Sequence, residues 1–402
     1  MVLDGMRSAP LVHSKLRLAA HLVAALSLAC TVSSSEVAPP NAVERGADDV
    51  EGAEVAPDKP AQPDPSAPGP LPPAPEGPTY TVKDYAELAA ALATAKAGEV
   101  IYVADSAEID LTDKPVVKLA GGVTLKSGRG INGSKGARLF STDEGQVPLI
   151  QVDGEGVTIS GLRIEGPVKA ERAAELKALL AKDKYYDMPF SRGIASAFSK
   201  TTIEYSELSG WTHCAICFFK AETGQIVREN YIHHNARYGL GYGVMTEAKE
   251  ALVTKNLFDR NRHAIATPGK PGASYEASEN VVFRGTYSHD FDVHGGVDRG
   301  DGTNIAGTKF DIHHNRYYST VSYNFLIRGV PQDQVHVRDE EYAHANITAA
   351  VAVSNVGSSR SPLAHPQIFT IGTNKFGIAR PAGIPAAPDV YLPDALAPLP
   401  VR

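Results

Sequence analysis

The sequence predicts an all-β protein built as a parallel β-solenoid, with one helix near its start and one helical insert. Three observations predict it. Pairs of apolar residues, five apart, recur along the chain at intervals of 24 to 44 residues, which is the self-similarity expected of a solenoid. Asparagine recurs at one position of the repeated unit, as expected of stacked tight turns. Helix-forming stretches are confined to two short segments.

The N-terminus has the organisation of a secretory signal. Three basic residues precede an apolar run over residues 18–29, which is too short to span a bilayer. The run ends in "LSLAC", which resembles the lipobox of bacterial lipoproteins, whose cysteine is lipidated after cleavage; Ser27 and Leu28 depart from that pattern. We therefore expect residues 1–30 to be a signal peptide that leaves Cys30 lipidated. An ordinary secreted protein cut nearby is the alternative.

Residues 31–79 form a linker rather than a domain. Twelve of the 28 prolines and no aromatic residue fall there, so the stretch cannot bury enough apolar surface to offset its ordering entropy. It carries nine acidic and two basic side chains, and residues 1–30 carry +2, so residues 80–402 carry −2 of the total −7. A net charge this close to zero indicates neither a basic nucleic-acid-binding surface nor a strongly acidic one. We expect a monomer in the bacterial cell envelope, lipid-anchored to a membrane, or secreted.

Residues 80–402 are long enough for one large domain. They open with a short strand, a predicted helix over residues 84–96 with alanine and leucine on one face, and Gly98 as a stop signal before the next strand. We expect this helix to cap the solenoid. No later apolar stretch is long enough for a membrane helix.

The repeat begins after this helix and defines the predicted coils. The apolar pairs are Ile159/Ile164, Ile203/Leu208, Val227/Ile232, Val253/Phe258, Val282/Tyr287, Ile312/Tyr317 and Val337/Tyr342. Three residues into the unit stand Asn230, Asn256 and Asn315, with Ser206 and Gly285 in other copies. Asparagine tolerates the left-handed conformation and can bond to its neighbour above. The longest interval contains a helix-forming insert, "VKAERAAELKALLAKDKYYDM", which we expect to lie against the side of the solenoid.

These units resemble the right-handed parallel β-helix of the pectate-lyase-like class, and in particular the NosD-like repeat with its "I-x-x-N-x-I" pattern. The resemblance covers residues 80–375. It implies a single right-handed parallel β-helix with an N-terminal capping helix and one helical insert. This fold carries lyases, hydrolases, epimerases and non-catalytic proteins, so the activity has to be inferred from the site.

A ladder of polar residues marks one side of the predicted coils. Ten residues after four successive first members stand His213, Arg237, His263 and Asp292, and six residues before two of them stand Glu247 and Glu276. Equal positions of neighbouring coils lie about 4.8 Å apart. The loops "ATPGKPGAS" and "GGVDRGDGTN" lengthen the same coils and are expected to wall a groove. A merely solvated face is the alternative interpretation of the ladder.

The ladder suggests proton-transfer chemistry on a polysaccharide. We predict a catalytic set of His263, Asp292, His294 and Arg237, since an aspartate beside a histidine tunes it for proton transfer and an arginine stabilises developing charge. The predicted substrate-binding residues are His213, Glu247, Glu276, Asp298, Arg299, Asp301 and Arg328. "FDVH" is similar to the Asp-Pro-His motif of mannuronan C5-epimerases, with Val293 in place of proline.

Several functions remain open at this level. Polysaccharide lyase is preferred over glycoside hydrolase, for which Glu247 with Glu276 or Asp292 would serve as the two carboxylates. A uronate C5-epimerase, a non-catalytic glycan-binding protein and a NosD-type periplasmic accessory protein are the alternatives. The metal requirement is undefined; "DRGDGTN" suggests calcium but lacks the downstream glutamate of an EF-hand, and a glycine-rich turn explains it more simply.

Two further expectations concern cysteine and histidine. Cys214 and Cys217 are three apart on a predicted strand, so their side chains should point to opposite faces and not form a disulfide. The histidines of the two "IHHN" segments, next to the asparagine turns, are expected to be structural or to face solvent. Substitution of the predicted catalytic residues should change thermal stability only modestly, because groove residues carry little packing.

The lipid anchor has a direct test. We expect Cys30→Ser to move the protein from the membrane fraction to the soluble fraction while the body stays folded, as followed by fractionation and circular dichroism. Limited proteolysis should cut within residues 31–79, where nothing can pack. Unchanged membrane association of the variant would remove the support for lipidation.

Overall fold

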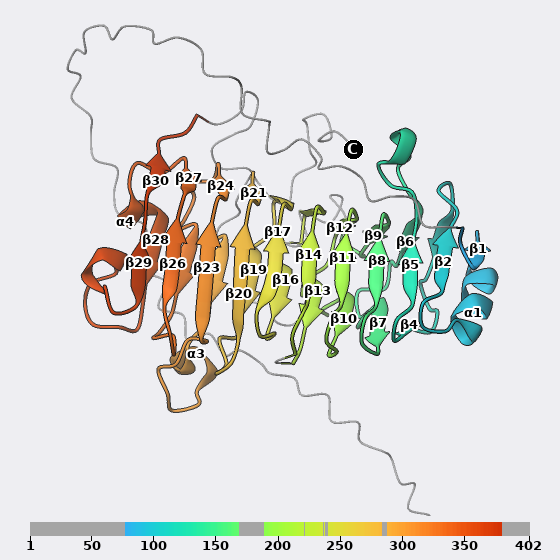
Figure 1. The fold of residues 1–402 in the computed structure, drawn as a ribbon, viewed down its shortest axis with the longest axis horizontal. Coiled ribbons are helices and arrows are strands. Elements are labelled where there is room, and N and C mark those ends of the chain that lie inside the picture. The colour runs from blue at the N-terminus through green and yellow to red at the C-terminus, as the bar shows by residue number, and fades with distance from the viewer. Residues whose placement is uncertain are drawn as a thin grey trace, which may run out of the picture. The chain divides into compact units, whose positions relative to one another are not determined.

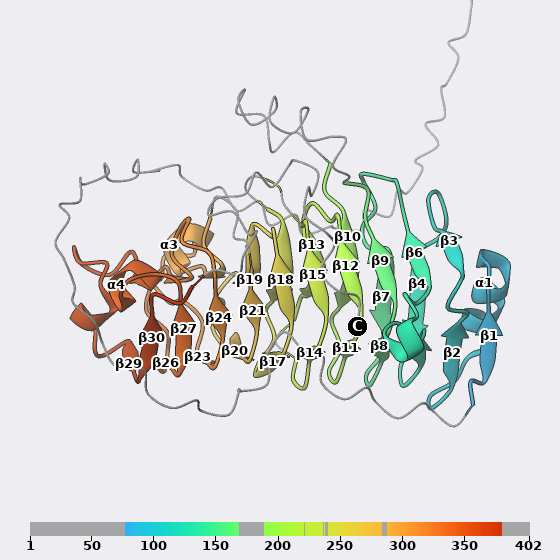
Figure 2. The ribbon, with the colours of Figure 1, turned by 90° about the horizontal axis from the view of Figure 1, so that it is seen from above.

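The computed structural model describes residues 77–168, 189–220, 222–235, 237, 240–283 and 288–379. They fold as a right-handed parallel β-helix, as the repeat predicts. Three parallel sheets run along the molecule, and each coil adds one strand to each sheet (Figures 1 and 2). The predicted signal peptide, Cys30, residues 31–76 of the linker and residues 169–188 of the helical insert lie outside the described residues.

Sheet A is the longest of the three sheets. In spatial order its strands are β1 (Tyr80–Val82), β2 (Val100–Val103), β5 (Thr124–Lys126), β8 (Thr158–Ser160), β11 (Thr202–Glu204), β14 (Ile226–Arg228), β17 (Ala251–Thr254), β20 (Ser274–Ser278), β23 (Lys309–His313), β26 (Val335–Arg338) and β29 (Phe369–Ile371).

Sheets B and C complete each coil. Sheet B consists of β3 (Glu108–Asp110), β6 (Arg138–Phe140), β9 (Arg163–Glu165), β12 (Glu207–Ser209), β15 (Tyr231–His233), β18 (Leu257–Asp259), β21 (Val281–Val282), β24 (Arg316–Tyr317), β27 (Glu340–Tyr342) and β30 (Asn374–Phe376). Sheet C consists of β4 (Val117–Ala120), β7 (Ile150–Asp153), β10 (Arg192–Ser196), β13 (Cys214–Phe218), β16 (Tyr242–Thr246), β19 (His263–Thr267), β22 (Phe291–Val293), β25 (Phe325–Ile327) and β28 (Val351–Val353).

Helix α1 (Tyr85–Thr94) covers the first coil (Figure 1). Its N-cap, Asp84, accepts a hydrogen bond from the backbone N–H of Glu87 at 3.0 Å, and Leu88 and Ala91 are buried. The predicted capping helix is therefore confirmed. The other short helices are η1 (Ile131–Gly133), α3 (Gly296–Arg299), α4 (Ile347–Ala350) and η4 (Pro362–Ala364). Among the described residues no helix is long and apolar enough to cross a membrane.

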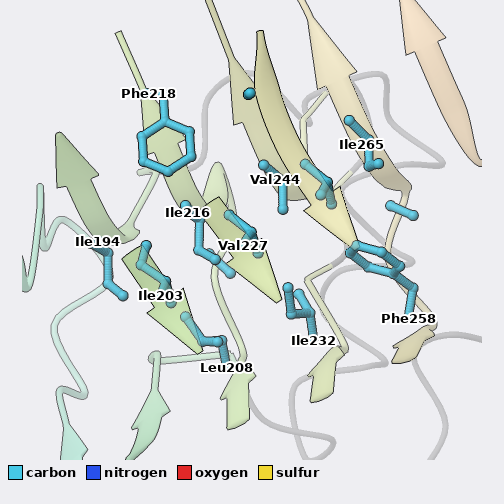
Figure 3. Packing of buried hydrophobic residues seen from close by; sticks show 14 of the residues in the cluster. Ile194, Ile203, Leu208, Ile216, Phe218, Val227, Ile232, Val244, Phe258 and Ile265 are labelled. Carbon is cyan, nitrogen blue, oxygen red and sulfur yellow. The ribbon is translucent and has the colours of Figure 1, made fainter. Parts of the chain in front are cut away.

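The core is made of columns of inward-facing apolar side chains, one residue per coil. Val227 pairs with Val253 on the neighbouring strand, and Ile232 pairs with Phe258 in the next sheet. These side chains are fully buried, and Figure 3 shows several of them stacked along the axis. Each pair therefore supplies one apolar residue to sheet A and one to sheet B, which explains the spacing of five.

The register of one coil was predicted wrongly. Val253 is followed in the sheet A column by Ala277, not by Val282, and Val282 follows Phe258 in the sheet B column. The apolar pair of this coil is therefore Ala277/Val282. Alanine is small enough to go unnoticed as a core residue, so the stronger apolar signal of Val282 shifted the coil by five residues.

Buried asparagines bind each coil to the next. The backbone N–H of Asn230 donates to Oδ1 of Asn256 (3.1 Å), and that of Asn256 donates to Oδ1 of Asn280 (3.0 Å). The N–H of Asn280 continues the ladder to Asn315 at 2.9 Å. Each such bond adds about 1 kcal/mol and fixes the position of one coil on the next. Asn280, rather than the predicted Gly285, occupies this position.

The left-handed residue of each turn precedes the asparagine. Glu229, Lys255 and Glu279 have φ of 56°, 56° and 55°, a conformation that is uncommon outside glycine. Asparagine was predicted to adopt it, but its role is to hold the turn by hydrogen bonds. His234 and His314 of the "IHHN" segments also have positive φ, 53° and 58°. These two histidines lie at turns, as predicted.

Cys214 and Cys217 form a disulfide on β13, contrary to the prediction. Their Cα atoms are 5.9 Å apart, whereas three residues of extended strand would span about 10 Å. The chain bends at Ala215, whose position has no partner in the ladders to β10 and β16. The bend, which the alternation rule did not anticipate, brings the two sulfurs together.

A glutamate takes the place of asparagine in one coil. Glu340 is 1% exposed, and its Oε1 accepts the backbone N–H and the Nδ2–H of Asn315 at 2.9 and 3.0 Å. The buried rings of Tyr317 and Tyr342 stack beside it. Burial raises the pKa of the Glu340 carboxyl to about 8, so the folded protein binds a proton here that the unfolded chain releases near pH 4.5.

We expect Glu340→Gln to remove a pH dependence of stability. Because the pKa of Glu340 is raised to about 8 in the folded state, the contribution of this carboxyl to the stability of the wild type is complete at low pH. The free energy of unfolding then falls by up to about 1.4 kcal/mol per pH unit between the unfolded and folded pKa values. Urea unfolding between pH 5 and 8 should show the variant gaining stability relative to wild type as pH rises. Glu341→Gln is the matched control, since Glu341 has a lowered pKa; equal slopes for wild type and Glu340→Gln would contradict the assignment.

Candidate active site

The candidate site lies on the outer face of sheet C, at strand β22, which pairs with β19 on one side and β25 on the other. Phe291 and Val293 point into the core, so Asp292 between them points outward. In the ladder Asp292 pairs with Ala266 on one side and Leu326 on the other. Both faces of β22 are buried. A carboxylate at such a position requires partners that compensate its burial.

Asp292 has three partners. Arg328, just after β25, binds it with both ends of its guanidinium fork, Nε to Oδ1 at 3.0 Å and Nη2 to Oδ2 at 2.8 Å. The Nε2 atoms of His294 and His263 lie 3.1 and 3.3 Å from Oδ2. Burial alone would raise the pKa of Asp292, but Arg328 and the two imidazoles lower it well below the usual range. Asp292 is therefore a buried, ionised carboxylate.

His263 is held in one tautomer. Its Nδ1 lies 2.5 Å from the carbonyl oxygen of His289, and because a carbonyl only accepts, Nδ1 carries the proton. Burial lowers the pKa of His263 well below 6.5, with a further contribution from Arg262. The neutral ring thus presents an unprotonated Nε2 to Asp292. A proton that arrived at this nitrogen would be stabilised by the carboxylate.

His294 connects the buried carboxylate to helix α3. Its Nε2 faces Asp292, and its Nδ1 lies 3.7 Å from Oδ2 of Asp298. Asp298 also lies 3.8 Å from Nη1 of Arg328 and caps α3 by accepting the N–H of Gly295 at 3.2 Å. His294 thus lies between two carboxylates, and the guanidinium of Arg328 lies beside both of them. Glycines at positions 295 and 296 let the chain turn tightly between β22 and α3, since a Cβ at either position would collide with backbone atoms.

Arg299 and Asp301 hold the loop rather than the cluster. Nη1 of Arg299 donates to the carbonyl oxygens of Pro268 and Gly269 at 2.7 and 2.6 Å. Asp301 accepts from Thr303, whose hydrogen bonds lower the pKa of Asp301 to about 2. Arg299 therefore joins the loop "GGVDRGDGTN" to the loop "ATPGKPGAS", and the two loops lie on the same side of the solenoid, as predicted. Arg299 and Asp301 are engaged in these contacts within and between the loops.

The predicted polar ladder is wrong as a ladder, although two of its members meet. On one side His263 pairs with Tyr242 rather than with Arg237, and on the other side Asp292 pairs with Ala266 rather than with His263. The contact between His263 and Asp292 therefore arises from their side chains. Arg237 lies beside His213 and donates to the carbonyl oxygen of Pro189 at 3.3 Å. His263, Asp292, His294 and Arg328 are brought together, with Asp298 behind them.

The predicted stacking of two glutamates is also wrong. Glu247 follows β16 on sheet C and pairs with Lys270 at 3.0 Å. Glu276 lies in β20 of sheet A, between Leu252 and Asp311, and faces His313 at 3.3 Å. The same shift of one coil caused this error. The pair cannot serve as two carboxylates of one site.

His289 was missed as a site residue. It is half-buried, stacks on His263 with ring centroids 5.8 Å apart, and its Nδ1 lies 3.0 Å from Oγ of Ser322. His263 and Asp292 are 0% exposed, so His289 is the imidazole of this group that a ligand can reach. Its place three residues before Asp292 was a usable signal, but strand alternation would put the two on opposite faces.

The described residues contain no group of three or more histidine, cysteine, aspartate or glutamate side chains arranged to hold a metal ion. The glycine-rich loop for which calcium was considered makes its own contacts. Asp301 bonds to Thr303 and Arg299, and Asp298 bonds to Gly295. The loop is thus a closed turn with an internal ion pair.

Comparison with known proteins shows likeness of fold. No family model and no curated protein matches the chain. The Dettilon tailspike protein (gp208) is similar at 13% identity and a TM-score of 0.47, over 72% of this chain and 57% of that one. An alginate lyase from Paenibacillus sp. str. FPU-7 is similar at 15% identity and 0.43, over 74% and 94%. Escherichia coli ybhc is similar at 11% identity and a TM-score of 0.31, over 79% of this chain and 90% of that one. The chain thus spans little more than half of the tailspike chain, and at these identities the likeness is one of fold alone.

Burial of the cluster reverses the expectation of a modest effect on stability. We expect Asp292→Ala to lower the free energy of unfolding by about 3–5 kcal/mol, because it removes the bidentate partner of a mostly buried guanidinium. Since the pKa of Asp292 is lowered in the folded state, its contribution exists above the ordinary value of 3.8 and is lost as pH falls. Urea unfolding should therefore show the largest deficit at neutral pH. Asp301→Asn in the adjacent loop is the control, with a much smaller loss; equal losses would contradict the central role of Asp292.

Proposed function

We propose that the chain is an extracytoplasmic enzyme that removes the C5 proton of a uronic acid unit in an acidic polysaccharide. β-Elimination, which cleaves the chain, is the favoured outcome, and C5 epimerisation is the alternative. The observation that carries the proposal is the convergence of two imidazoles and one guanidinium on the buried carboxylate of Asp292. Such a group can accept, hold and return a proton beside a fixed positive charge.

The exposure of the side chains assigns their roles. His289 is neutral at pH 7, since burial lowers its pKa to about 3, and it takes the C5 proton. The electron pair of the C5–H bond moves into the carboxylate of the sugar, and Arg328 stabilises this charge. His263 and Asp292 lie behind these groups as positioning residues, because neither is exposed.

The second half of the reaction needs a proton donor. In elimination the electron pair forms the C4–C5 double bond, the C4–O bond breaks, and the leaving oxygen takes up the proton that His289 accepted from C5. In epimerisation the C4–O bond stays intact and a proton returns to C5 from the opposite face. Both outcomes use the same first step, so the cluster alone does not separate them.

Hydrolysis is less well supported. A glycoside hydrolase requires two carboxyl groups placed about the scissile bond. Glu247 and Glu276 lie on different sheets, and Asp298, the second carboxylate near Asp292, is engaged by the same histidine and arginine. The pair that the hydrolase interpretation needed is not assembled.

A non-catalytic glycan-binding protein is the second candidate. The complete burial of Asp292 and His263 favours it, because a polar network of this kind also serves to hold three coils together. In that case the rings and Arg328 would bind a sugar without proton transfer. The two candidates differ in whether a carbon-bound hydrogen of the sugar is exchanged.

Location outside the cytoplasm has independent support. The Cys214–Cys217 disulfide suits an oxidising compartment, as does the signal-like N-terminus of the sequence. We propose attachment to the cell envelope through lipidated Cys30, with the linker over residues 31–79 as a spacer.

Incubation with polygalacturonate, alginate and a neutral glucan in D₂O tests the function directly. A lyase produces ultraviolet absorbance from the unsaturated end and new reducing ends. An epimerase incorporates deuterium at C5 without cleavage, and a hydrolase produces reducing ends without absorbance. Binding without any of these changes would support the second candidate and refute catalysis.

The roles within the cluster are tested by substitution. We expect His289→Ala and His263→Ala each to reduce turnover by about 10²-fold or more, and the double variant to be little worse than the poorer single variant. Circular dichroism should show that His289→Ala remains folded, since the ring is half-buried. Full activity in both single variants would refute the assignment.

A further inference from the structure

A second cationic group lies on the outer face of sheet C, several coils before Asp292. Arg192, the first residue of β10, is half-buried. Its guanidinium carbon lies 5.2 Å from the ring centroid of Phe190 and 4.9 Å from that of Phe219. Phe190 is 37% exposed. Two aromatic rings thus flank one positive charge, an arrangement that suits a ligand with both an apolar face and an anionic group.

The charge of this group is not compensated by a described carboxylate. Nε of Arg192 donates to Nδ1 of His213 at 2.7 Å, so His213 is neutral with its proton on Nε2. Burial lowers the pKa of His213 to about 3, and Arg192 and Arg237 add to this effect. Within the described residues no carboxylate pairs with Arg192. A partly desolvated guanidinium of this kind favours an anionic ligand that matches its fork.

A continuous row of rings joins this group to the candidate active site. Centroid distances along the row are 5.4 Å for Phe190–His213, 6.0 Å for His213–Tyr242, 5.5 Å for Tyr242–His263 and 5.8 Å for His263–His289. In the ladder Arg192 pairs with Cys214, Cys214 with Tyr242, and Tyr242 with His263. These three steps of ~4.8 Å separate Arg192 from His263 by about 14 Å along the axis.

We propose that Arg192, Phe190 and Phe219 form a distal subsite for a carboxylate-bearing sugar unit of a uronic acid polymer lying along the solenoid axis. The inference rests on the proposed function for the class of ligand, because the polymer must also reach Asp292 and Arg328. The phenyl rings pack on the apolar face of the sugar, and the guanidinium binds its carboxylate. Two arginines at the two ends of the row then select an acidic chain long enough to span them.

Binding as a function of oligomer length tests the subsite. Size-fractionated oligogalacturonates and oligomannuronates are titrated by calorimetry in a His289→Ala background, which prevents turnover. Affinity should rise at the length that first reaches Arg192. Arg192→Gln should weaken binding of the longer oligomers about tenfold or more, the loss of one charge-assisted contact, and leave the shortest ones unchanged. Phe190→Ala should give a smaller loss that persists at high salt, because the ring contact is not ionic.

Arg228→Gln is the matched control, since Arg228 lies on sheet A and pairs with Glu204 at 2.8 Å; it should bind as the parent does. Equal affinity of Arg192→Gln and its parent for long acidic oligomers would overturn the subsite. So would an affinity that does not rise with length, or an absence of binding to every acidic oligomer. Because the titration needs no turnover, length-dependent binding by a chain without catalytic activity supports the subsite while refuting the proposed reaction.

Discussion

The stacking of equivalent residues in successive coils is the constraint on which the rest of the structure depends. Parallel pairing puts each residue about 4.8 Å from its counterpart, and the bonds from Asn230 to Asn256 and from Asn256 to Asn280 maintain this register. A substitution at one of these stacked positions therefore affects the contacts of both neighbouring coils. The same stacking lines up the rings of His213, Tyr242, His263 and His289 along the axis, which is the basis of the proposed site for a linear ligand.

The candidate site shows how one buried carboxylate organises its surroundings. Arg328, His263 and His294 come from three different coils and meet at Asp292. Arg328 pairs with the carboxylate directly, whereas the ring of His263 is held by its bond to the carbonyl oxygen of His289. This arrangement is stable in the free protein, so little reorganisation is needed when charge develops on a ligand. It also links function to folding, because loss of Asp292 disturbs both.

The sequence predicted the fold more securely than the site, for a physical reason. The prediction of the core columns rests on a pattern repeated over many coils, so the wrong register of the coil that contains Ala277 did not obscure the solenoid. A site depends on single positions, and the same shift moved Glu276 to another sheet. The closeness of His263, Asp292 and His294 was predicted correctly in spite of this error, since long side chains bridge adjacent coils. His289 was missed because a bulge on sheet C, visible as bonds from the N–H groups of Ala264 and Ile265 to one carbonyl, breaks the alternation.

Helix α1 has a consequence for the state of the protein at high concentration. A parallel solenoid ends in unpaired strand edges, which invite end-to-end growth into filaments. At one end α1 packs on β1, β2 and β4, and at the other α4 and η4 pack on β28 and β29. Helix α1 thus shields the first coil, and α4 and η4 shield the last strands of sheets C and A. Such shielding opposes the end-to-end association of many copies at high local concentration.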